Sequence, residues 1–200
     1  FYACAGEVAP VADFVRSMLA AGTLPPVAIA IPLGALTLRA TLSRVTGEGQ
    51  VAWHTGKLNP KQWIGIWARH LAFNACDVGA GRPTLVCGLR QRIDLAPIED
   101  ARQQLAALLH LWVRAGQEPV PFFPWSSHAF ADVTRKGRGD PLRAARAKFY
   151  SNESSDVPGE CEDAYVELAF RGVDDPLAGD FGLIAFDVFA PLFEAMEVRT

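Results

Sequence analysis

The chain has 200 residues, of which 50% are hydrophobic and 20% charged, and its net charge at pH 7 is −3. This balance argues against a strongly basic nucleic-acid-binding domain, so any contact with nucleic acid must come from a local patch or from a partner. No apolar run approaches the roughly 20 residues of a membrane span, and no signal peptide is recognisable. We therefore expect no membrane contact and a cytoplasmic location.

Cysteine usage and the first residue give two further expectations. The cysteines are Cys4, Cys76, Cys87 and Cys161. Their spacing fits neither a zinc site nor a compact disulfide framework, so we expect reduced thiols and no metal or other cofactor. The chain begins at Phe1 rather than at methionine, so we expect a piece of a longer protein; a processed N-terminus is the alternative.

The first 54 residues predict a helix followed by three strands. Apolar residues recur at helical spacing over residues 8–21, and Gly22 ends the repeat. Residues 27–31 form a short apolar strand. Residues 36–45 alternate, and residues 50–54 return after a turn at 46–49, which predicts a β-hairpin between these two segments.

The next segment predicts a helix, a strand and a second helix. Asn59 and Pro60 begin a helix that is apolar on most sides and therefore buried. Residues 84–89 predict a strand, residues 90–95 a short polar connection, and residues 97–115 a helix. The alternation of helices and strands indicates a layered α/β or α+β domain.

The remaining residues predict an extension that packs on this core. Residues 117–134 are rich in proline and aromatic side chains and predict a loop. Helices are expected at residues 141–149, 160–170 and 186–198. We therefore assign a core to residues 1–116 and a C-terminal extension to residues 117–200, together forming one structural domain.

The predicted hairpin resembles the active-site strands of PD-(D/E)xK nucleases, which read roughly G-R-I-D-R-V and V-D-Y-K-T-G. Here the two strands read ATLSRV and VAWHTG. Ser43 takes the place of the first metal-binding carboxylate, Ala52 that of the second, and His54 that of the lysine. The resemblance implies a degenerate PD-(D/E)xK core, with a mixed central sheet flanked by helices and C-terminal helices added.

These substitutions predict a hairpin without catalytic activity. Phosphodiester cleavage in such a site needs a divalent ion that generates the nucleophile and neutralises charge on the phosphate. Magnesium is usually anchored by one or two carboxylates. A hydroxyl, a methyl group and an imidazole cannot replace two carboxylates and an ammonium, so we expect no catalytic or metal-binding residues here.

Further segments resemble the C-terminal domain of RecC, the gamma subunit of exodeoxyribonuclease V (the RecBCD helicase–nuclease). They are WIGIWARHLAF at 63–73, the run from Pro97 to Trp125, the residues around Ala147–Phe149 and the closing FAPLF at 189–193. The resemblance implies RecB-like and RecD-like partner subunits, duplex DNA ends and unwound single strands as ligands, and a role in duplex splitting, strand guidance and double-strand break repair. It does not place the strand-splitting pin, for which residues 46–50 and 77–82 are candidates.

Two groups of cations could contact DNA. The first lies near the predicted hairpin and comprises Arg39, Arg44, Lys57 and Lys61. Trp53 beside them could stack on a base or face the core. The second, with Arg143 and Arg146, belongs to a basic block at 135–148 that precedes an acidic block at 153–180. Such blocks suggest interaction surfaces, although solvated faces or mutual pairing are alternatives.

Two rival functions remain open at this point. The first is an active metal-dependent nuclease with relocated carboxylates, for which Asp94 and Glu99 are the candidates. The second is a protein-docking module without DNA contact.

Overall fold

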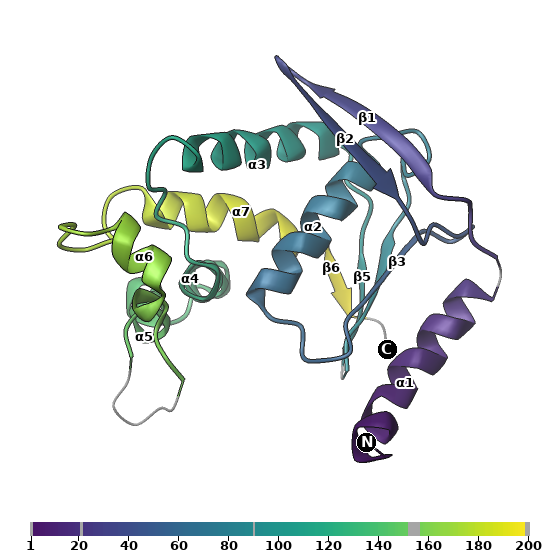
Figure 1. Ribbon diagram of the computed structural model, residues 1–200, viewed down its shortest axis with the longest axis horizontal. Coiled ribbons are helices and arrows are strands. Elements are labelled where there is room, and N and C mark those ends of the chain that lie inside the picture. The colour runs from purple at the N-terminus through teal and green to yellow at the C-terminus, as the bar shows by residue number, and fades with distance from the viewer. Residues whose placement is uncertain (1, 21, 90, 152–156, 199–200) are drawn as a thin grey trace. The chain divides into compact units, whose positions relative to one another are not determined.

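The computed structural model describes residues 2–20, 22–89, 91–151 and 157–198. The chain forms two compact units (Figure 1). The N-terminal unit comprises Phe1–Leu109 and Ala195–Thr200, and the inserted unit comprises His110–Glu194. The assignment of residues 1–116 and 117–200 to a core and an extension stays a prediction. Within the described ranges, no helix combines the length and apolar character needed to cross a membrane.

Among the residues that the structure describes, three helices and six strands lie wholly or mainly in the N-terminal unit. They are α1 (Tyr2–Leu19), β1 (Val27–Leu33), β2 (Leu36–Leu42), β3 (Gln50–Trp53), α2 (Pro60–Asn74), β4 (Thr84–Cys87), β5 (Arg92–Leu95), α3 (Ala101–Ala115) and β6 (Met196–Val198). The predicted α/β character is confirmed. Helix α3 begins later than expected, since Glu99 and Asp100 precede it.

The central sheet is mixed, as predicted, and has the strand order β3-β4-β5-β6. Strands β3 and β4 are parallel, whereas β5 runs antiparallel to both of its neighbours. The prediction of a polar connection at 90–95 was wrong for residues 92–95, which form β5 at an inner position between β4 and β6; residue 90 lies outside the described residues. The last predicted helix also ends early: residues 196–198 leave it and form β6 beside β5.

Strands β1 and β2 form a separate two-stranded sheet, so the predicted pairing of residues 36–45 with 50–54 was wrong for β2 and holds only next to the turn. A two-residue turn at Gly34, where φ is 65°, joins β1 to β2. Beyond β2, Arg44 has a φ of 62°, a left-handed conformation that interrupts an extended strand. An isolated bridge between Val45 and Gln50 is the ladder contact that remains between the two predicted strands.

Helices α1 and α2 pack on opposite faces of the central sheet. Val11 and Val15 of α1 form a cluster with Cys87. His70 of α2 bonds instead to Thr84, which lies three residues before Cys87 on β4 and therefore points to the other face. The predicted start of α2 is confirmed, because Asn59 and Gln62 form a reciprocal capping box before Pro60.

The inserted unit is helical. It contains α4 (Pro124–Lys136), α5 (Pro141–Phe149), the short 3-10 helix η1 (Glu160–Glu162), α6 (Ala164–Ala169) and most of α7 (Phe181–Ala195). Its core is built around Phe123, Phe149 and Phe181, which are all buried.

Helix α4 replaces the second part of the loop that was predicted at 117–134, whereas residues 117–123 form no helix or strand. Phe123, at its N-cap, provides no side-chain cap. The carboxylate of Glu160, which lies 35 residues after Trp125, accepts hydrogen bonds from the backbone N–H groups of Trp125 and Ser126. A cap from so distant a residue leaves no local signal in the sequence.

Candidate nucleic-acid interface

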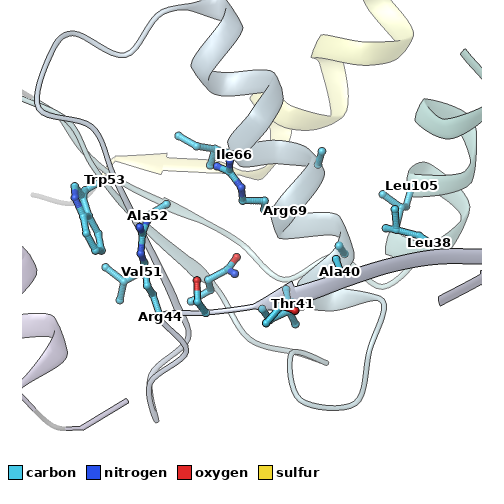
Figure 2. Close-up of a pocket in the computed structure, with 15 residues that line it drawn as sticks. Leu38, Ala40, Thr41, Arg44, Val51, Ala52, Trp53, Ile66, Arg69 and Leu105 are labelled. Carbon is cyan, nitrogen blue, oxygen red and sulfur yellow. The ribbon is translucent and has the colours of Figure 1, made fainter. Parts of the chain in front are cut away.

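A cavity of about 520 Å³ lies among β2, β3 and α2, and Figure 2 shows side chains from all three elements around it. We call it the groove. Its polar lining comes from five side chains: Thr41, Ser43, Arg44, Gln50 and Arg69. None of the fifteen lining residues is aspartate or glutamate, so the groove carries two guanidinium groups and no carboxylate.

Arg44 is held at the groove by an aromatic ring. Its guanidinium carbon lies 4.0 Å from the centre of the Trp53 ring, within the range of a cation–π interaction. Trp53 is half-buried and packs against the cluster that α1 forms with Cys87. The tryptophan therefore serves as a fixed support for the guanidinium, and in this conformation its ring is not an open surface for a base.

The three positions that were compared with the ligands of a nuclease separate in the structure. Ser43 and Ala52 line the groove, whereas His54 does not. The Nδ1 atom of His54 accepts a hydrogen bond from the backbone N–H of Gly56 at 3.0 Å. The backbone N–H of His54 donates to the carbonyl of Cys87 at 2.9 Å. The imidazole is thus engaged in the turn that follows β3.

The cations predicted near the hairpin also separate. Arg44 lines the groove, but Arg39, Lys57 and Lys61 are exposed outside its lining. Sequence reasoning missed Arg69, which extends from α2 toward the cavity (Figure 2). Its spacing of three residues from the groove residues Ile66 and Ala72 places all three on one face of α2, a signal that was present in the sequence.

The second predicted cation pair lies on α5 in the inserted unit. A guanidinium nitrogen of Arg146 lies 2.7 Å from a carboxylate oxygen of Asp175, and this ion pair lowers the pKa of Asp175 below its usual range. Arg143 is exposed, with its backbone N–H capped by Asp140. Part of the acidic block, residues 153–156, lies outside the described residues.

The proposed replacement carboxylates lie away from the groove. Asp94 is on β5, opposite Glu197 in the register of β6, and Glu99 is exposed before α3. Within the described ranges, no three His, Cys, Asp or Glu side chains gather closely enough to hold a metal ion. The groove offers hydrogen-bond donors instead: two planar guanidinium groups, which match the geometry of phosphate oxygens, and two hydroxyls.

The family model of the RecC C-terminal domain matches residues 1–135. The chain belongs to the RecC C-terminal domain family. This membership confirms the resemblance seen in the sequence and indicates a RecC-like subunit of an exodeoxyribonuclease V-type complex. The matched RecC segment contains every residue that lines the groove. A comparison with curated proteins found no match.

Proposed function

We propose that this chain is a non-catalytic RecC-like domain that holds the DNA backbone in the groove while its complex splits and guides the strands of a broken duplex. RecB-like and RecD-like subunits are its partners, and duplex ends and unwound single strands are its ligands. Arg44 and Arg69 are the primary phosphate contacts, and the exposed Arg39 extends this surface along β2.

The observation that carries this proposal is the charge of the groove. The chain as a whole is acidic, yet the groove has two arginines and no acidic side chain. Phosphate contacts from Lys and Arg supply most of the sequence-independent affinity for nucleic acid. A cavity with this lining fits a DNA backbone that is bound through its phosphates without reading the bases. Such binding suits a protein along which DNA of any sequence moves.

Arg44→Gln combined with Arg69→Gln should weaken binding to forked DNA and flatten its salt dependence. Losing two phosphate contacts lowers the slope of log K against log salt by about 1.4 for single strands or about 1.8 for duplex. Fluorescence anisotropy with a labelled fork at several salt concentrations measures this slope. The matched control, Lys57→Gln with Lys61→Gln, removes equal charge outside the groove and should leave most of the slope. If the two double variants behave alike, the groove is not the binding site.

The strand-splitting role fits the β1–β2 hairpin better than the two turns considered from the sequence. Arg82 ties those turns together, because its guanidinium donates to the carbonyls of Thr46 and Gly47 on one turn and to Val78 on the other. The tip of the β1–β2 hairpin is exposed at Gly34 and Leu36 and extends outward from the N-terminal unit (Figure 1). We assign the wedge to this tip.

The opposed carboxylates of Asp94 and Glu197 keep one rival open, a nuclease with relocated ligands. We expect no cleavage when labelled single-stranded or forked DNA is incubated with the chain and Mg²⁺ or Mn²⁺, because the groove lacks the anionic ligands that anchor the metal. Sustained cleavage that disappears in Asp94→Asn would instead establish the nuclease. Cleavage that persists in that variant would point to a contaminating enzyme.

A further inference from the structure

A second surface, on the inserted unit, has the opposite character to the groove. Its centre is α6, where Tyr165 and Leu168 are 84% and 63% exposed. A shallow cavity of about 300 Å³ lies beside α6, and Tyr150 and Val173, both exposed, contribute to its lining. We call α6 and this cavity the α6 surface. Three of these four exposed side chains lie within residues 165–173, and Tyr150 joins them from the end of α5, so together they exceed the scattered exposure that is normal for a protein surface.

The α6 surface is built on a firm base. Val166 and Phe170, on the inner side of α6, pack against the core cluster around Phe149. Asp163 caps the helix by accepting a hydrogen bond from the N–H of Tyr165. The backbone at Gly159, just before η1, lies closely against the end of α5, since a Cβ atom at this position would be 2.5 Å from the Phe149 carbonyl oxygen. The exposed side chains therefore stand on an ordered scaffold and are presented to solvent.

The charge around these apolar side chains is negative. Residues 157–174 contain five carboxylates and one cation, Arg171. Glu160 and Asp163 are engaged in capping α4 and α6. Glu167 and Asp174 line the cavity together with Arg171, and neither carboxylate forms an ion pair with any described residue. Because carboxylates outnumber the single cation in this segment, the complementary ligand is a protein segment with apolar anchors and flanking Lys or Arg side chains rather than nucleic acid.

We propose that the α6 surface docks a basic, apolar segment of a partner subunit in the assembled complex. Apolar side chains of that segment pack on Tyr165 and Leu168, and its cations face Glu167 and Asp174. The choice of a partner subunit, rather than a second copy of this chain, rests on the proposed role within a RecC-like complex. In this arrangement the N-terminal unit contacts DNA through the groove, and the inserted unit contacts a partner protein through the α6 surface.

Two double variants test the surface, each with a matched control on α7. Tyr165→Ser with Leu168→Ser removes the apolar contact, and Leu183→Ser, 70% exposed, is its control. Glu167→Lys with Asp174→Lys reverses the charge, and the exposed Asp187→Lys is its control. Circular dichroism and thermal unfolding of each variant establish that folding is unchanged, as expected for exposed positions.

The full-length subunit carrying each variant is titrated with the RecB-like and RecD-like subunits, and assembly is followed by analytical ultracentrifugation. Peptides of 15 residues that tile both partners are then tested for binding to the same variants. We expect assembly to weaken at least tenfold in both double variants, with the controls unchanged and at least one basic peptide binding only when the surface is intact.

Three outcomes would overturn the proposal: unaltered assembly, a loss of self-association in place of heteromeric assembly, or weaker fork binding by the isolated chain carrying Tyr165→Ser and Leu168→Ser. Fork binding by the Arg44 and Arg69 variants reports on the groove separately, so a failure of one site is distinguishable from a failure of the other.

Discussion

Gly49→Ala should destabilise the N-terminal unit by roughly 3 kcal/mol or more. Gly49 has a φ of 150°, where side chains are rarely accommodated, and a Cβ atom there would lie 2.3 Å from the backbone carbonyl oxygen of Pro83. That same carbonyl accepts a hydrogen bond from the N–H of Gln50 at 3.1 Å, which places β3 beside β4. The methyl group would therefore separate the two parallel strands at their start.

Gly47→Ala is the matched control for this substitution. Gly47 lies in the same turn, and a Cβ atom there would meet nothing within 4 Å. Urea unfolding followed by tryptophan fluorescence should show a lower midpoint for Gly49→Ala and a nearly unchanged midpoint for Gly47→Ala. Because Gln50 begins the strand that lines the groove, fork binding should also weaken in Gly49→Ala alone. Equal midpoints for the two variants would contradict the close approach of these backbones.

The N-terminal unit should lose about 3 kcal/mol of stability between pH 7 and pH 4 through one histidine. His70 is fully buried, and burial lowers its pKa to about 4. The unfolded value is about 6.5, so the unfolded chain binds a proton over this range and the folded chain does not. The contribution is fully present above pH 6.5 and is lost progressively as the pH falls toward 4.

The structure explains why His70 stays neutral. Its Nε2 atom donates to the carbonyl of Ala96 at 3.0 Å, and its Nδ1 atom accepts from the hydroxyl of Thr84 at 2.8 Å. This arrangement requires one proton on the ring and joins α2 to β4 and to the segment before α3. The neighbouring Asn74 extends the network to the N–H of Ile98.

The slope of unfolding free energy against pH, measured by urea titrations between pH 4 and 7, checks this prediction. His70→Gln should flatten the slope even if it also lowers stability at every pH, whereas His110→Gln, at an exposed position, should preserve it. His128, whose pKa is also lowered by burial, accounts for part of any remaining slope. An unchanged slope in His70→Gln would show that this imidazole does not control the acid response.

The elements that the sequence predicted correctly are those with strong local signals. The capping box at Asn59 and the Asp140–Pro141 start of α5 depend on neighbouring residues, and both lie where expected. The errors arise where partners are distant in sequence. Strand β5 is only four residues long, includes Arg92 and Asp94, and pairs with β4 and β6 on either side, whereas α4 takes its cap from Glu160. No local pattern carries that information.

The candidate site shows the same division. Arg44 and Trp53 are close in sequence and meet in the structure, but the predicted pairing of their strands is limited to the bridge between Val45 and Gln50. The left-handed conformation of Arg44 redirects the chain after β2 and turns its guanidinium over the tryptophan ring. Arg69 comes from a helix that the sequence placed correctly, yet its orientation toward the cavity depends on how α2 packs against the sheet.

Strand β6 has a consequence for biogenesis. The first segment of the N-terminal unit ends at Leu109, and its last strand, β6, begins only at Met196. During synthesis, one edge of β5 therefore stays unpaired while the 100 residues between the two strands, 96–195, are made. An unpaired strand edge can pair with another molecule, so nascent or truncated chains that stop before β6 are prone to aggregate. In the chain that includes β6, this edge of β5 is paired.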